Sequence, residues 1–270
     1  MVKKSASISV QYDSPFSPFS GKHFPQALQW VRDCGFEGVE LVVSDPSLLD
    51  ADAVFKQINI HGLKVSTIAT GQAAGLEGLS LTSTSRQVRE ATRQRLLDHV
   101  DFAVCLGGAN ITIGSLRGKG GGLPLCDELT LLRHELLPVA EYAKRCGITI
   151  NLEPINRYET CLLNTTQAVY EFLNSLDGLE NVGILYDTFH SNIEDTDMIQ
   201  SIKLYGEKFS HVHFADSNRC LPGEGHTDFV GISRALDCIG YDGYISLEVA
   251  NNPSPQHIIE NAAQSLVFCV

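Results

Sequence analysis

The sequence alternates short apolar runs, each long enough for one β-strand, with longer stretches in which apolar residues recur at helical spacing. Eight such runs can be read, and this number constrains the fold more than any other feature of the chain. They are "SISVQY" (7–12), "GVELVV" (38–43), "KVSTIA" (64–69), "ANITIG" (109–114), "ITINLE" (148–153), "VGILYD" (182–187), "HVHFAD" (211–216) and "YISLEV" (244–249). Strands that alternate with helices form a parallel sheet, because each helix carries the chain back to the start of the next strand.

The helical pattern is clearest in residues 84–106 and 127–146, with start signals at Ser85 and Asp127 and a stop signal at "RCG" (145–147). Eight β-then-α units within about 250 residues predict an α/β fold, a single (β/α)8 TIM barrel. A doubly wound sheet would usually have fewer strands and a G-x-G-x-x-G nucleotide fingerprint, and none of the runs is followed by one. Because no linker or tandem repeat divides the chain, we predict one domain over residues 1–270.

Composition narrows the classes of partner. The 43% hydrophobic and 19% charged residues are typical of a globular protein, and the net charge of −12 argues against a nucleic-acid partner. No stretch approaches the roughly 20 apolar residues of a membrane span, so we expect no membrane association and a cytoplasmic location. The eight cysteines form no C-x-x-C pair, and we expect reduced, mostly buried thiols.

The last four apolar runs each bring a side chain that can bind metal to the same end of the predicted barrel. Residues two apart on a strand point the same way, and the chemistry of TIM barrels lies at the carboxyl ends of the strands. This parity selects Glu153, Asp187, His213 and Glu248. Three carboxylates and an imidazole suit Mn²⁺, Mg²⁺ or Co²⁺ and do not exclude Zn²⁺.

A single acid at a strand end is more often a helix cap or an ion-pair partner than a metal ligand. Burying three carboxylates together without a cation would be very costly, however, so we predict a metal site. His211 shares the face of His213 but lies about 6.6 Å deeper by the strand rise. We therefore predict that His211 is a hydrogen-bonded histidine beneath the site.

Four motifs carry a resemblance to a known family: "LEPINRYET" (152–160), "YDTFHSNIE" (186–194), "HVHFADSNRCLPGEGHTDF" (211–229) and "SLEVAN" (246–251). In order and spacing they resemble the ketose 3-epimerases, the D-tagatose and D-psicose 3-epimerase group of the xylose isomerase-like TIM barrels. The N-terminal half matches only in outline, through Glu40 at the end of the second run and "TGQ" (70–72) after the third.

The resemblance implies a metal-dependent sugar epimerase of carbohydrate metabolism that acts on a ketose or ketose derivative at C3 through a cis-enediolate. It implies one divalent ion per chain, with Mn²⁺ expected first and Mg²⁺, Co²⁺ or Zn²⁺ as alternatives. It also implies a homodimer or homotetramer. The implied ligands are Glu153, Asp187, His213 and Glu248; Glu153 and Glu248 are the implied acid and base, and Glu159, His190 and Arg219 the implied substrate contacts.

The loop after the fourth run departs from the family. The best-known free-sugar epimerases have a tryptophan there, whereas the only tryptophan of this chain is Trp30, in the first predicted helix. The loop "GSLRGKGGGLP" (114–124) lacks the phosphate-loop spacing and offers Arg117 and Lys119 instead. We predict that Arg117 binds a carboxylate or phosphate of the substrate, and a flexible, solvated loop is the equal alternative.

Other activities use the same kind of site. An aldose–ketose or hydroxypyruvate-type isomerase would move the proton between C1 and C2, and a metal-dependent dehydratase would expel a hydroxyl group. An endonuclease acting on abasic DNA would need more inward histidines, and the acidic charge opposes it. A non-catalytic binding barrel is the alternative of another class, and the presence of both Glu153 and Glu248 argues against it.

Overall fold

Eight parallel strands close into a barrel in chain order, with β1 paired to both β2 and β8. The structure, a computed structural model, describes residues 2–176 and 178–267, so Cys269 and the outermost ends of the predicted domain lie outside it. The strands are β1 (Lys3–Ser9), β2 (Gly38–Val42), β3 (Lys64–Ala69), β4 (Asn110–Ile113), β5 (Ile150–Leu152), β6 (Val182–Asp187), β7 (Phe209–Phe214) and β8 (Tyr244–Leu247). The predicted (β/α)8 TIM barrel is confirmed.

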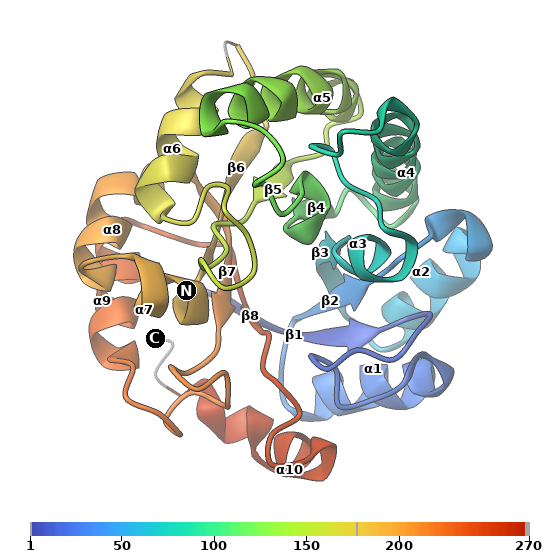
Figure 1. Ribbon diagram of the computed structural model, residues 1–270. Coiled ribbons are helices and arrows are strands. Elements are labelled where there is room, and N and C mark those ends of the chain that lie inside the picture. Colours follow the sequence, from blue (N-terminus) through green and yellow to red (C-terminus); the bar gives the residue numbers. More distant parts are fainter. Residues whose placement is uncertain (1, 177, 268–270) are drawn as a thin grey trace.

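Helices form a ring around the strands (Figure 1). They are α1 (Phe24–Asp33), α2 (Ala51–Ile60), α3 (Gln72–Glu77), α4 (Arg86–Cys105), α5 (Leu125–Arg145), α6 (Thr166–Asn174), α7 (Thr188–Glu194), α8 (Met198–Tyr205), α9 (Phe229–Cys238) and α10 (Pro255–Ser265). Short 3₁₀ turns are η1 (Gly21–His23), η2 (Pro46–Leu48), η3 (Ser115–Arg117) and η4 (Gly206–Lys208).

The two clearest predicted helices are present, with one boundary moved. Ser85 caps α4, accepting a hydrogen bond from the amide of Val88, as its position predicted. Helix α5 begins at Leu125 rather than at Asp127, because the carbonyl oxygen of Pro124 already accepts hydrogen bonds from the amides of residues 127 and 128. Asp127 lies in the first turn, where its charge favours the helix N-terminus.

The first strand was predicted four residues too late. It runs over Lys3–Ser9 instead of residues 7–12, and Lys3 pairs with Tyr244 of β8. A search for apolar runs misses this start because the ammonium group of Lys3 lies over the Tyr244 ring on the outside of the barrel, 5.3 Å from the ring centroid.

The predicted alternation of faces holds in β5. Ile150 and Leu152 pack in the hydrophobic core, whereas Asn151 points into the barrel. Its amide donates to the hydroxyl groups of Thr67 and Thr112, each at 3.1 Å. This buried polar layer fills the barrel below the carboxyl ends of the strands, so side chains that project beyond it meet at the mouth.

The thiols are less buried than predicted. Of the seven described cysteines, none of which forms a disulfide, only Cys220 is buried. Cys105, Cys126, Cys161 and Cys238 are exposed, because they lie on the solvent side of the helix ring or in a surface loop. No helix among the described residues combines the length and the apolar character needed to cross a membrane.

Candidate metal centre and substrate pocket

The four predicted metal ligands meet at the barrel mouth. Asp187 ends β6, His213 lies in β7, and Glu153 and Glu248 directly follow β5 and β8. The Nδ1 atom of His213 lies 3.6 Å from Oδ2 of Asp187 and 3.6 Å from Oε2 of Glu248. Oε1 of Glu153 lies 3.8 Å from the same nitrogen, and one potential ligand atom from each residue falls within 4.8 Å of the others.

This cluster fits a divalent cation. Oδ2 of Asp187 and Nδ1 of His213 are buried and have no hydrogen-bond partner, which is costly unless another group satisfies them. Burial and the charge of Glu248 raise the pKa of Glu153 well above its ordinary value. The carboxylates are therefore crowded and short of positive charge, and the mostly oxygen donor set is one that Mn²⁺ or Mg²⁺ prefers.

Glu40 lies beneath the cluster and reaches across the barrel from β2. Its Oε2 atom accepts hydrogen bonds from Nε2 of His213 at 2.9 Å and of His211 at 3.2 Å. Burial alone would raise the pKa of Glu40, but the two histidines outweigh burial and hold the pKa below its usual range. Because an ionised carboxylate only accepts, each Nε2 must carry a proton, and Nδ1 of His213 is the ring nitrogen that faces the carboxylates.

The predicted location of His211 beneath the site, with a hydrogen bond, is confirmed. The sequence offered no sign that Glu40 would pair with both histidines. It showed only that this acid lies within the second run, and the partners lie 171 and 173 residues away.

Arg219 covers the cluster from the loop after β7. Its Nη2 atom donates to Oε2 of Glu248 at 2.5 Å and lies 3.8 Å from Oδ2 of Asp187. The guanidinium group is held between the rings of Phe16 and Phe189, 4.4 and 4.6 Å from their centroids. Sequence reasoning missed Phe16, whose loop after β1 closes one side of the pocket.

His190 and Glu159, both predicted to contact substrate, are held by a residue that sequence reasoning missed. The side-chain nitrogen Nδ2 of Asn156 lies 2.8 Å from Nδ1 of His190 and donates to Oε1 of Glu159 at 2.9 Å. Nε2 of His190 then carries the ring proton and lies 3.7 Å from Oε1 of Glu153. Burial lowers the pKa of His190, which favours the neutral ring.

Arg117 is neither solvated nor on a free loop. It ends η3, has no exposed surface, and donates from Nη1 to the carbonyl oxygen of Glu153. The chain can turn beside it because the next residue is Gly118, with φ of +108°, where a Cβ atom would collide with Thr82. The alternative of a flexible, solvated loop is therefore wrong for this part of the segment.

A pocket of about 340 Å³ opens above the four candidate ligands. Its wall comes from loops that follow several strands, and it includes Phe16, Glu159, His190 and Arg219. The structure thus brings three of the predicted substrate contacts to the rim of one pocket, and Arg117 lies behind it, in contact with the backbone of Glu153.

A sequence profile described as xylose isomerase-like TIM barrel matches residues 28–268. The chain belongs to this family. It is 33% identical over 222 residues to an L-ribulose 3-epimerase of Mesorhizobium japonicum, which covers 80% of this chain and 72% of the relative. It is 32% identical over 233 residues to a ketose 3-epimerase of Arthrobacter globiformis, covering 85% and 78% of the two chains.

Solved structures agree with the family assignment. A structure of an L-ribulose 3-epimerase superposes with a TM-score of 0.81 at 29% identity and covers 97% of this chain and 86% of its own. A Methylomonas D-allulose 3-epimerase in complex with D-allulose, at 24% identity and a TM-score of 0.80, supports the fold alone. The predicted membership of the ketose 3-epimerase group is confirmed, whereas the roles of individual site residues stay predictions.

Proposed function

We propose that this protein is a divalent-metal-dependent ketose 3-epimerase in which Glu153 and Glu248 exchange the proton at C3. The observation that carries the proposal is the convergence of these two glutamates with Asp187 and His213 at the barrel mouth. Relatives named ketose 3-epimerase and L-ribulose 3-epimerase support the substrate class. The four residues would hold one ion per chain, with Mn²⁺ expected first.

The chemistry needs two protonation sites on opposite faces of one carbon. A bound divalent cation would stabilise the negative charge that develops on substrate oxygen atoms. One glutamate removes the proton from C3 and leaves a planar cis-enediolate; the other, already protonated, delivers its proton to the opposite face. Glu153 and Glu248 follow strands that lie three apart around the barrel, so their carboxylates approach the pocket from different sides.

The surrounding residues would position the sugar. Arg219, held between two aromatic rings and paired with Glu248, can donate to substrate oxygen atoms from its remaining N–H groups. The Nε2–H group of His190 faces the same space, and Glu159 can accept from a hydroxyl group at the rim. These contacts fix the orientation of C3 between the two carboxylates.

The proposal is tested by incubating the Mn²⁺-loaded protein with neutral ketoses in D₂O and following deuterium by NMR. After each turnover both glutamates return to their starting protonation states through exchange with solvent, so deuterium is expected at C3 together with the C3 epimer. Glu248→Gln should abolish both. Glu224→Gln is the matched control, because Glu224 pairs only at the surface, with His257.

Deuterium at C1 or C2 with aldose formation would replace the epimerase with an aldose–ketose isomerase, and loss of a hydroxyl group would indicate a dehydratase. A metal-loaded Glu248→Gln variant that retains full turnover would overturn the roles of the two glutamates. The homodimeric or homotetrameric state stays a prediction from the resemblance, and the cytoplasmic location stays a prediction from the sequence. Sedimentation velocity tests the oligomeric state.

A further inference from the structure

A second cavity adjoins the proposed substrate pocket. Its volume is about 710 Å³, against about 340 Å³ for the inner pocket. Small-molecule sites usually measure about 300–1,000 Å³, so the inner pocket has the size for a small sugar and the outer cavity leaves room for a further group. The residues that line both are Gly71, Gly75, Ser115, Ile155 and Glu159.

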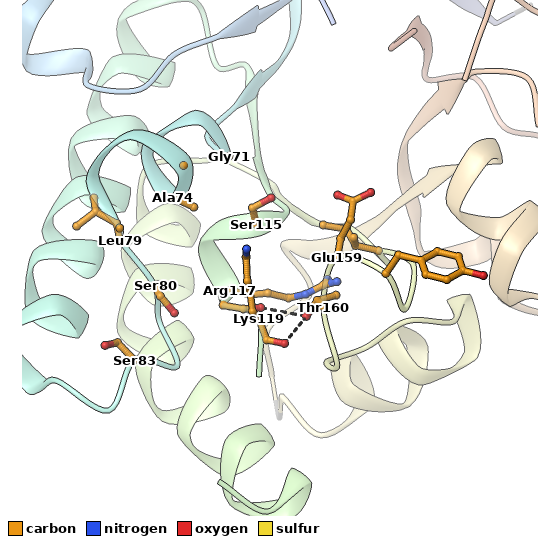
Figure 2. Close-up of a pocket in the computed structure, with 15 residues that line it drawn as sticks. Gly71, Ala74, Leu79, Ser80, Ser83, Ser115, Arg117, Lys119, Glu159 and Thr160 are labelled. Carbon is orange, nitrogen blue, oxygen red and sulfur yellow. Dashed lines mark hydrogen bonds between the residues drawn. The ribbon is translucent and has the colours of Figure 1, made fainter. Parts of the chain in front are cut away.

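Two cations line the outer cavity. Neither forms an ion pair with a described residue, although the carboxylates of Glu153 and Glu159 attract Arg117 electrostatically. Lys119 is exposed, and Figure 2 shows its amine directed into the cavity toward Ser115. Arg117 lies behind the wall, and its Nε and Nη2 atoms have no hydrogen-bond partner. The guanidinium group of an arginine stays charged at neutral pH.

The rest of the lining suits an anion as well. The side chains of Ser80 and Ser115 face the cavity in Figure 2 and supply hydroxyl donors. Glu159 is the one acid among the lining residues, and its carboxylate already accepts from Asn156 and lies 3.9 Å from Nη1 of Arg219. The cavity is therefore locally positive in a protein whose net charge is −12.

We propose, on the basis of the epimerase function above, that the outer cavity binds an anionic group of the substrate. The substrate is then a ketose that carries a phosphate or a carboxylate on a carbon remote from C3. Because Arg117 is buried behind the wall, its charge would attract an anion held by Lys119 without touching it, and that anion would offset part of the cost of burying the guanidinium group. A phosphate oxygen can also accept from the amine and from the serine hydroxyl groups together.

The test measures binding with probes that have no ketone or aldehyde group and cannot react. D-sorbitol, D-sorbitol 6-phosphate, D-gluconate and maltitol are titrated into the Mn²⁺-loaded protein by calorimetry in a phosphate-free buffer. We expect sorbitol 6-phosphate, gluconate or both to bind about tenfold more tightly than sorbitol, as one charge-assisted contact would provide. Preference for one anion over the other identifies the group as phosphate or carboxylate.

Lys119→Met removes the exposed cation while Arg117 stays in place. This variant should bind the anionic probes no more than about twofold more tightly than sorbitol. Lys56→Met is the matched control, because Lys56 is an exposed lysine of α2 outside both pockets, and it should leave the preference unchanged. These readouts are independent of turnover, so they separate a failure of this proposal from a failure of the epimerase function.

Equal binding of sorbitol and the anionic probes would overturn the proposal. An undiminished preference in Lys119→Met would overturn it too, because the anion would then be held elsewhere, for example by the Mn²⁺ ion itself. If maltitol exceeded sorbitol in affinity by as much as the anionic probes do, the cavity would select size rather than charge. That result would also overturn the proposal.

Discussion

Replacing Glu40 by glutamine should weaken metal binding although Glu40 contacts none of the carboxylates at the mouth. Its carboxylate is fully buried and accepts from Nε2 of His213 at 2.9 Å and of His211 at 3.2 Å. A glutamine has nearly the same shape and keeps one oxygen acceptor, but it removes the negative charge that supports both imidazole rings. His213 would then be a less basic ligand and less firmly oriented.

The size of the effect follows from those two hydrogen bonds. Loss of an outer partner of a ligating histidine typically weakens metal affinity by about 10–100-fold, which corresponds to about 1.4–2.7 kcal/mol. Each hydrogen bond to a charged group contributes about 1.5–3 kcal/mol, so the loss of one such contact is enough. We therefore expect the dissociation constant for Mn²⁺ to rise by at least about tenfold in Glu40→Gln.

The assay is a titration of metal-free protein with Mn²⁺, followed by the electron paramagnetic resonance signal of the free ion. Glu135→Gln is the matched control, because Glu135 is a buried carboxylate that pairs with Arg89 at 2.9 Å and Arg93 at 2.5 Å between α4 and α5. It should lower the unfolding free energy and leave Mn²⁺ affinity unchanged. Wild-type affinity in Glu40→Gln, or an equal loss in Glu135→Gln, would refute the positioning role.

Two glycines allow further tests. In Gly114→Ala the new Cβ atom would lie 2.5 Å from Oε2 of Glu153. Because that carboxylate can swing away, the fold should hold, but the displaced glutamate should lower kcat/KM by about 100-fold. An unchanged Mn²⁺ titration and an unchanged rate would contradict this prediction. In Gly183→Ala the Cβ atom would lie 2.8 Å from Cβ of Ser210 and 2.9 Å from the carbonyl oxygen of Lys208. Urea unfolding should then show a loss of about 1–3 kcal/mol, whereas wild-type stability would mean that the barrel wall can yield there.

Strand parity was enough to find the four residues at the mouth. Side chains alternate with a period of two, and all eight strands of a TIM barrel run in the same direction, so one rule applied to the later strands selects the inward side chains near one end. The rule tolerates boundary errors, because a shift of strand ends does not change which residues face inward. Glu153 and Glu248 lie one residue beyond their strands and still point to the cluster.

The contacts of Glu40 and Arg117 could not be predicted in the same way. The pairing of Glu40 with two histidines of β7 depends on the diameter of the barrel and on the depth of each side chain, which a single run of residues does not encode. Arg117 lies in a glycine-rich segment, where charges are usually solvated. It is buried because the chain folds back over it at Gly118, a conformation that depends on packing against Thr82 rather than on local sequence.

The charges around the mouth explain why its residues depend on one another. When all four carboxylates are ionised and both histidines of β7 are neutral, as a bound cation would favour, four negative charges face two guanidinium groups. This leaves two uncompensated negative charges in a region of low dielectric. The charged groups are Glu40, Glu153, Asp187, Glu248, Arg117 and Arg219. One divalent cation would bring the sum to zero.

A balance of this kind makes single substitutions act on the metal before they act on the fold. Removing Glu40 leaves too little negative charge to retain the ion tightly, whereas the polar layer of Thr67, Thr112 and Asn151 below it stays hydrogen-bonded and keeps the barrel closed. The same reasoning applies to the outer cavity. Because the sum that makes the inner site neutral already includes Arg117, the charge of Lys119 is the one that remains available to an anionic group of the substrate.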